Sequence, residues 1–126
     1  MANILDIGKT GEQAAAKFLK DNGYEILEMN FKNNSGHRLG EIDIISRENI
    51  SEELVFVEVK TREYEKYKDT LPEENITPSK LRKLSRIASF YLHEKKLGAS
   101  NYRFDAISVW IGKNGNLVEI KHIRGL

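Results

Sequence analysis

GEIDIISRENISEELVFVEVK, residues 40–60, contains two apolar runs joined by a polar loop, and each run predicts a β-strand. Successive side chains of a strand point to opposite faces of the sheet, so Glu58 and Lys60 are neighbours on one face of the second strand. The residues around them are Val and Phe, which are typical of a strand that is covered by protein. An acid and a base at such a position therefore need an explanation.

The first strand of this stretch carries a second acidic face. Glu41 and Asp43 point to the same side, and Ile42 and Ile44 point to the other. If the two strands pair antiparallel, Asp43 meets Glu58 on one face only when the numbers of paired residues add to an odd value, as they do when 43 pairs with 58. In that register one face holds three carboxylates and the ammonium group of a lysine.

Close carboxylates favour a bound cation. Removing two like charges from water costs several kcal/mol per ion, and a divalent cation between them reverses the sign of the interaction. Mg²⁺ prefers one or two carboxylates together with water and phosphate oxygens, so Asp43 and Glu58 predict a partial ligand shell open to a phosphodiester. Lys60 is then placed to orient the attacking water or to stabilise the phosphorane oxygens. The alternative is a cross-strand ion pair on a solvated face, which contributes only ~0.2–1 kcal/mol.

Helices and further strands are predicted on both sides of this pair. Thr10 is a suitable N-cap for a first helix at 11–22. Thr77 and Pro78 begin a longer amphipathic helix, and Gly98 is placed just after its end. Strands are expected at 24–32, 41–46, 54–60, 102–111 and 117–123, the last two as a hairpin. The predicted fold is an α/β domain in which helices flank a mixed central sheet.

Two helical residues and one helix face extend the candidate site. Glu12 lies in the first turn of the first predicted helix, where it is either a further metal ligand or an acid that stabilises the helix dipole. Lys80 lies in the first turn of the second helix and either binds nucleic acid or lays its stem along Leu84. Basic residues on the far side of that helix are typical of a phosphate-binding stripe and of an ordinary solvated face. They are Arg82, Lys83 and Arg86.

Composition limits the class of protein. With 126 residues the chain is expected to form one domain, 1–126. Its 20 basic and 19 acidic residues leave a formal charge of +1, which argues neither for nor against a nucleic-acid partner. The absence of cysteine excludes disulfides and thiolate metal sites and fits a reducing compartment. No apolar run is long enough to span a membrane and no signal peptide is evident, so we expect a soluble, cytoplasmic protein.

Several other polar residues are expected to be structural or incidental. His37, His93 and His122 lie far apart without the spacing of a zinc site, and we expect none of them to be functional. Asp105 is expected to face solvent or to brace a helix end. The charged segment 62–75 has no sustained period and predicts a surface loop that could serve as a lid.

The segments GKTGEQAAAKFLKDNGYEILEMNFK, GEIDII, LVFVEVKTR and YRFDAISVW follow one another along almost the whole chain. They resemble the YraN-like family, small bacterial proteins of the restriction-endonuclease-like superfamily, whose nuclease motif is PD-(D/E)xK. The resemblance implies the αβββαβ core of that superfamily, in agreement with the order of elements predicted from periodicity. The chain departs from the family pattern in the loop 63–75, which lacks a glycine-containing stretch, and at its end, HIRGL.

The resemblance also implies roles for particular residues. The implied catalytic set is Glu12, Asp43, Glu58 and Lys60. The first three would bind the metal, and Glu12 corresponds to a helix acid of archaeal Holliday-junction-resolvase-like relatives. Lys80 matches the family's lysine on the helix after the motif. Glu41 also matches, as an accessory acid that either binds the metal through water or caps the site.

The leading hypothesis from the sequence is a Mg²⁺- or Mn²⁺-dependent endonuclease or a branched-DNA-processing protein, with DNA favoured over RNA as partner. The alternative is a nucleic-acid-binding module that keeps the nuclease-like fold without catalysis of its own. A structural protein without nucleic acid ranks third. Resolvase-like relatives further imply a homodimer, because two symmetric cuts need two sites.

Overall fold

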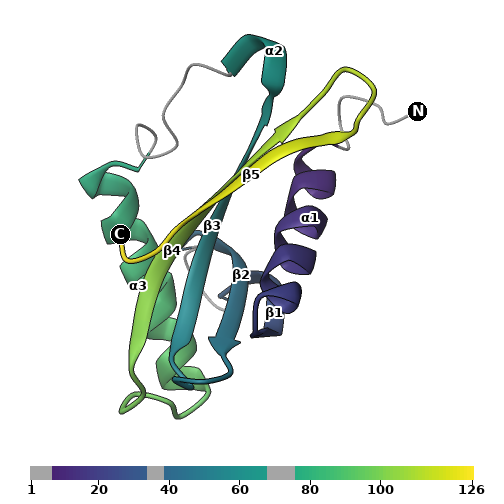
Figure 1. Ribbon diagram of the computed structural model, residues 1–126. Helices are drawn as coiled ribbons and strands as arrows, with labels where there is room; N and C mark the ends of the chain where they lie inside the picture. The colour runs from purple at the N-terminus through teal and green to yellow at the C-terminus, as the bar shows by residue number, and fades with distance from the viewer. Residues whose placement is uncertain (1–6, 34–38, 68–75) are drawn as a thin grey trace.

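The computed structural model describes residues 7–33, 39–67 and 76–126, and its elements follow the predicted order (Figure 1). They are α1 (Ile7–Asp21), β1 (Tyr24–Lys32), β2 (Glu41–Glu48), β3 (Leu54–Glu63), α2 (Tyr64–Tyr67), α3 (Pro78–Glu94), β4 (Tyr102–Ile111) and β5 (Leu117–Ile123). The bounds of β1, β4 and β5 are those predicted, whereas β2 and β3 are longer. No helix in the described part of the chain is long and apolar enough to cross a membrane.

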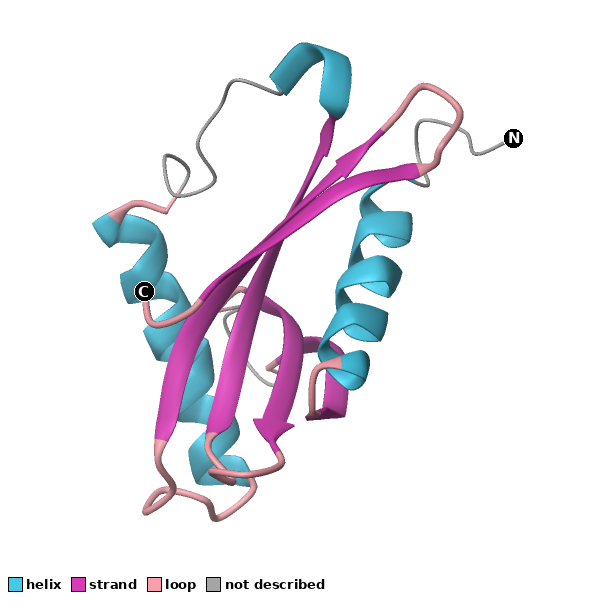
Figure 2. Cartoon of the chain, viewed as in Figure 1, coloured by secondary structure: helices cyan, strands magenta, loops and turns pink. Residues whose placement is uncertain are grey.

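The five strands form one mixed sheet in the order β1-β2-β3-β4-β5. Every neighbouring pair is antiparallel except β3 and β4, which are parallel. A parallel pair needs a long crossover connection, and α3 lies within that connection. Figure 2 shows α1 and α3 on opposite sides of the sheet. The prediction of a mixed central sheet flanked by helices is therefore confirmed.

Alternation along β3 divides the core into two clusters. Val55 and Val57 pack with Leu19 of α1, and Leu54 and Phe56 pack in the cluster on the α3 side. Each face of the strand is thus buried under a helix, which accounts for a run that is apolar on both faces.

Alternation was a poorer guide in β2. Ile42 and Ile44 were predicted to share a face, but Ile44 packs on the α1 side and Ile42 in the cluster on the α3 side. The prediction is wrong, because strict alternation is not kept beyond Ile44, where the regular pairing of β2 with β3 ends.

Two predicted helix ends differ from the structure. The first helix begins at Ile7, so Thr10 lies inside it and is not its N-cap. Thr77 does cap α3, because its side chain accepts the N–H of Lys80 at 3.1 Å. That helix ends at Glu94 rather than just before Gly98. Lys96 takes the left-handed position after it with φ 58°, a place that glycine usually fills.

Part of the predicted surface loop is regular structure. Arg62 and Glu63 continue β3, and α2 follows directly. The strand therefore carries three more positions on its faces, 61–63, than the sequence pattern indicated. The remainder of the loop, 68–75, and the turn at 34–38 with His37 lie outside the described residues.

A close approach between α1 and β3 fixes the position of the first helix. A Cβ atom added at Gly11 would lie 2.8 Å from both Cβ and Cγ2 of Thr61, and closer still to its hydroxyl. Rotating the threonine cannot remove contacts to its Cβ, so only glycine allows this separation of helix and strand. Gly11 thereby holds its neighbour Glu12 close to the sheet.

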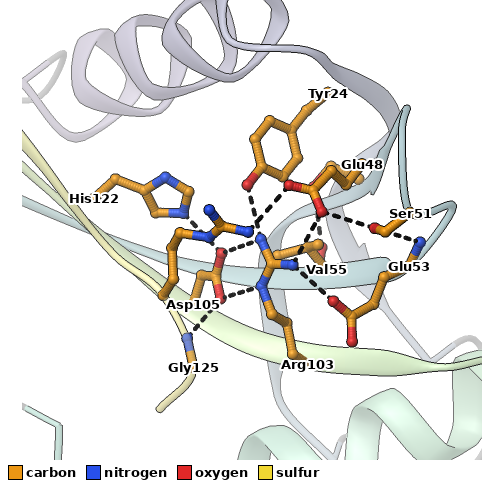
Figure 3. Close-up of polar contacts among 11 residues, drawn as sticks. Tyr24, Glu48, Ser51, Glu53, Val55, Arg103, Asp105, His122 and Gly125 are labelled. Atoms are coloured by element: carbon orange, nitrogen blue, oxygen red, sulfur yellow. Dashed lines mark hydrogen bonds and ion pairs between the residues drawn. The ribbon is translucent and has the colours of Figure 1, made fainter.

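Asp105 is fully buried, so the prediction that it faces solvent or braces a helix end is wrong. Its carboxylate accepts hydrogen bonds from Nε and Nη2 of Arg103 at 2.9 and 3.2 Å and from the N–H of Gly125 at 3.0 Å. Nε2 of His122 lies 2.7 Å from the same carboxylate, so this histidine is not incidental (Figure 3). The carboxylate was misjudged because partners from β4, β5 and the C-terminal residues meet only in the folded chain.

Arg103 extends this cluster to the start of β3. Its guanidinium donates to Glu53 at 2.7 Å and to the hydroxyl of Tyr24 at 2.7 Å, and it lies 3.5 Å from Glu48. Burial opposes ionisation of Asp105, but hydrogen bonds from His122, Arg103 and Gly125 outweigh it and lower the pKa of its carboxyl. The cluster ties four strands, β1, β2, β4 and β5, and the C-terminal residues together.

Replacing Gly11 by Ala should lower the free energy of unfolding by about 1–3 kcal/mol, because the added Cβ overpacks the contact with Thr61. Gly8→Ala is the matched control, since it lies on the same helix with no atom within 4 Å of the added Cβ. The control should be unchanged or more stable by up to ~1 kcal/mol. Urea denaturation measures both; equal effects would contradict the close-approach argument.

Asp105→Asn should destabilise the protein by about 1–3 kcal/mol at pH 7, because a neutral amide weakens the charge-assisted bonds that Arg103 and His122 make to this buried side chain. The guanidinium of Arg103 keeps Glu53 and Glu48 as counter-charges. The folded pKa of Asp105 lies below the unfolded one, so its stabilisation is present above the unfolded pKa and is lost at lower pH. The difference between wild type and variant should therefore shrink in acid. Denaturation at several pH values measures it, and a constant small difference would refute the role of the charge.

Candidate metal and nucleic-acid site

The site begins where β2 and β3 separate. Their antiparallel pairing runs from Arg47 with Leu54 to Ile44 with Val57, which is the odd-sum register that the sequence required. Beyond this last pair the carboxylate of Asp43 accepts the N–H of Val59 at 2.8 Å. A side chain thus replaces the next rung of the backbone ladder, and the two strands diverge around it.

A cavity of about 270 Å³ opens between these strand ends and α3. The acidic wall consists of Glu41 and Asp43 from β2 and Glu58 from β3, and the helix contributes Lys80 and Lys83. The remaining lining residues are Gly40, Leu84 and Ile87. The fold therefore brings together most of the residues that the sequence singled out, from segments far apart in the chain.

The lysine of α3 is paired with the acid of β3. Nζ of Lys80 lies 2.7 Å from Oε1 of Glu58, and the two side chains are 32% and 13% exposed. Lys80 therefore does more than lay its stem along an apolar surface. Because the pair is largely shielded from water, it holds the helix start against the strand end more firmly than a surface ion pair would.

Carboxylates of three residues converge beside the cavity. Oxygens of Glu12, Glu41 and Asp43 all lie within 4.8 Å of one another. The first turn of α1 contains no acid, so Glu12 belongs to the second turn and the helix-dipole interpretation loses its basis. Glu12 and Asp43 are two of the three predicted metal ligands, and Glu41 is the predicted accessory acid. The third predicted ligand, Glu58, is not in this group and pairs with Lys80 instead.

Asn30 is a member of the site that sequence reasoning missed. Its Nδ2 donates to both carboxylate oxygens of Glu12 at 3.1 and 3.0 Å and to Glu41 at 3.0 Å. The residue has φ 53°, and asparagine is among the few side chains that tolerate this left-handed backbone. Alternation of β1 gave no signal for it, because the left-handed residue interrupts the regular pattern of the strand.

Other predicted residues lie outside this contact set. Lys60 is half-buried on β3 opposite Ser108 of β4, and it forms no ion pair with any residue that the structure describes. Lys83 lines the cavity, while Arg82 and Arg86 are exposed on α3 away from its lining. The basic stripe thus borders the cavity on one side only.

Electrostatics at the strand ends favour a neutral Asp43. Burial, together with the nearby charges of Glu58 and Glu12, raises the pKa of this carboxyl from 3.8 to about 7, against the opposing hydrogen bond from Val59. A divalent cation bound to these carboxylates would favour the ionised form of Asp43. Carboxylate oxygens are ligands that Mg²⁺ and Mn²⁺ prefer.

Comparison with known proteins places the chain in a family. The model of "Uncharacterised protein family UPF0102" matches residues 11–109. The chain belongs to the UPF0102 family. A UPF0102 protein of Syntrophus aciditrophicus (strain SB) is 42% identical over 120 residues, which is 95% of this chain and 88% of the relative. One from Caldicellulosiruptor saccharolyticus is 39% identical over 122 residues, 97% of each chain.

This membership confirms the predicted YraN-like family. A third UPF0102 relative, from Acetivibrio thermocellus, is 43% identical over 116 residues, covering 92% of this chain and 84% of its own. The names of these relatives state no activity. All the candidate site residues of this UPF0102 chain, from Glu12 to Arg86, lie inside the matched segment.

Asp43→Asn should stabilise the protein at neutral and alkaline pH. The folded pKa of Asp43, about 7, lies above the unfolded one, so the wild-type protein loses stability as the pH rises from about 4 to 7. The amide avoids this loss and still offers an oxygen to Val59. At pH 8 the variant should be more stable by on the order of 3 kcal/mol, and near pH 4 the difference should vanish.

Chemical denaturation in the presence of a chelator, from pH 4 to pH 8, measures this difference. Asp21→Asn is the control, because that carboxylate is exposed on α1 and, among the described residues, pairs with Lys17 at 2.8 Å. The control should change stability by less than about 1 kcal/mol at every pH. A variant of Asp43 that is less stable than wild type at pH 8 would show that its charge is favourable in the fold.

Proposed function

We propose that this UPF0102 protein is a metal-dependent endonuclease of the restriction-endonuclease-like superfamily, which hydrolyses phosphodiester bonds in nucleic acid, with branched DNA as the first substrate to test. The observation that carries the proposal is the cavity between β2, β3 and α3, where carboxylates and lysines from distant segments meet. A structural protein gains little from such an arrangement, because close carboxylates destabilise the fold that holds them.

The residues present fit a divalent cation. Asp43 and Glu58 would hold it, with Glu12 as a further ligand, and each offers the carboxylate oxygens that Mg²⁺ and Mn²⁺ bind. The bound ion would polarise the phosphodiester and lower the pKa of a water molecule. Because Mg²⁺ takes six ligands, three carboxylates would still leave positions in its shell for water and substrate oxygens.

The chain's own residues hold this site in shape. The N–H of Val59 fixes the carboxylate of Asp43, and the amide of Asn30 fixes Glu12 and Glu41. Because these groups are oriented before substrate arrives, less ordering remains for the reaction itself. Lys60, on the same face of β3 as Glu58, is the residue we assign to stabilising charge on the phosphorane.

The ion pair between Lys80 and Glu58 gives the lysine a second role. An incoming cation competes with the ammonium group for the same carboxylate. The released lysine lies at the cavity wall beside Lys83, where a phosphate oxygen would be its new partner. This exchange couples occupation of the acidic wall to binding of the nucleic-acid backbone.

A second function has an observation of its own. The acids already have protein partners, since Lys80 neutralises Glu58 and Asn30 satisfies Glu12 and Glu41. A site satisfied in this way is compatible with a nucleic-acid-binding module that does not cleave. In that case the exposed Arg82 and Arg86 would carry the affinity, and the acids would serve the fold alone.

Glu58→Gln should remove metal binding and cleavage without unfolding the domain. We expect wild-type protein to bind Mn²⁺ saturably in a calorimetric titration, and the variant to bind at least about tenfold more weakly, as one fewer ligand charge remains. Cleavage of a four-way DNA junction in the presence of Mn²⁺ should decrease together with Mn²⁺ binding. Glu119→Gln on the exposed part of β5 is the control and should retain both properties.

The same measurements separate the two candidate functions. Unchanged cleavage by the Glu58 variant would remove the endonuclease assignment. Wild-type protein that neither binds Mn²⁺ nor cleaves, even with junction DNA present, would argue against the endonuclease. If substituting Arg82 and Arg86 then abolishes DNA binding, the protein is a nucleic-acid-binding module. Absence of DNA binding under every condition would contradict both.

A further inference from the structure

The two terminal nitrogens of Arg62 are buried without a hydrogen-bond partner among the residues that the structure describes. The residue is 6% exposed, and the two nitrogens are Nη1 and Nη2. Within the described segments these are the only buried side-chain nitrogen or oxygen atoms in that condition. The other buried charge of the described chain, Asp105, is bound from several sides, so the lack of partners at Arg62 is not a general feature of this protein.

An unpartnered guanidinium is unfavourable in a protein interior. Arginine keeps its charge in proteins, so burial cannot be relieved by loss of a proton. Buried polar groups are almost always hydrogen-bonded, and an exception needs a reason such as a ligand that supplies the missing acceptors. Substituting an apolar residue at position 62 would remove the penalty, which suggests that the arginine serves binding rather than stability.

The position of Arg62 connects it with the candidate site. The side chain of Thr61 faces α1, because it lies against Gly11, so Arg62 faces the opposite side of the sheet. That is the side of Glu58 and Lys60, which precede it on alternate positions of β3. Successive members of this row are about 7 Å apart along the strand.

The chemistry of this row fits a nucleic-acid backbone. A single strand carries one phosphate for every ~3.4 Å of helix axis, so charges a few nucleotides away from the scissile phosphate fall within the length of the row. A guanidinium binds two phosphate oxygens at once through its planar set of donors, which an ammonium group cannot do. Trp110 of β4, a buried residue, is the partner of Arg62 in the parallel pairing.

We propose that Arg62 is a phosphate-binding residue that holds the nucleic-acid backbone next to the acidic cavity. This inference rests on the proposed function for the identity of the ligand. Both terminal nitrogens are shielded from solvent, so the guanidinium turns outward about its own side-chain torsions when a phosphate arrives. In its new position the guanidinium makes charge-assisted hydrogen bonds to the phosphate, which its terminal nitrogens lack in the buried position.

The test is the variant Arg62→Met, which keeps the apolar stem and removes the charge. Its affinity for a four-way DNA junction, measured by fluorescence anisotropy without divalent cation, should fall about tenfold, and the slope of log affinity against log salt should fall by about 1. Its melting temperature should rise, because an unpaired buried charge has been removed. A merely structural arginine would give the opposite change in melting temperature.

Arg47→Met is the matched control. Arg47 is a strand arginine at the other end of the β2 and β3 pair, opposite Leu54, and its guanidinium lies 3.8 Å from Glu25. This variant should keep the wild-type salt slope and affinity. If both variants lose the same affinity for the DNA junction, the effect of Arg62→Met comes only from the lower net positive charge, and the inference is overturned.

A second measurement keeps the inference independent of DNA binding. Inorganic pyrophosphate should raise the melting temperature of the wild-type protein and of Arg47→Met but leave that of Arg62→Met unchanged. If junction DNA fails to bind yet this difference is found, the anion site stands and the proposed nucleic-acid function fails. If DNA binds wild type and Arg62→Met equally, or if pyrophosphate stabilises both equally, the phosphate-binding role is refuted.

Discussion

The hydrogen bond from the N–H of Val59 to Asp43 is the contact on which the candidate site depends. It ends the ladder between the two strands and keeps them associated while they diverge. The divergence makes the room into which Glu58 and the lysines of α3 project. A regular rung at this point would close the cavity, so one side-chain acceptor in place of a backbone acceptor separates a plain hairpin from a candidate reaction site.

Much of this arrangement follows from local patterns, because those patterns report burial. Alternation located the strands, but it gave the register of β2 on β3 only as a condition, the odd sum under which Asp43 and Glu58 share a face. The N-cap at Thr77 was equally readable, as its signal lies within three residues. The start of α1 at Ile7 was not predicted, because Thr10 has the side chain of a typical N-cap although it lies inside the helix.

Residues whose role depends on distant partners were beyond such patterns. Asp105 was expected to face solvent or brace a helix end, because its ligands come from β4, β5 and Gly125. Asn30 contacts acids from two other elements, and Arg62 was assigned to a loop because the sequence around it is charged. Charge alone does not distinguish a surface segment from a strand end that is buried under its neighbours. The proposed roles of the acids also required chemistry and a family resemblance beyond any periodic pattern.

The parallel pairing of β3 with β4 has a consequence for the order of assembly. Strands β1 to β3 are consecutive antiparallel neighbours, so their contacts are local in sequence and close early with little loss of chain entropy. The parallel pair joins segments about forty to fifty residues apart and cannot form until the intervening chain has been placed. The acidic half of the site is therefore expected to assemble first, with its charges unneutralised, and Lys80 arrives with the later half. Nascent chains would pass through a stage in which Glu58 has not yet been neutralised by Lys80.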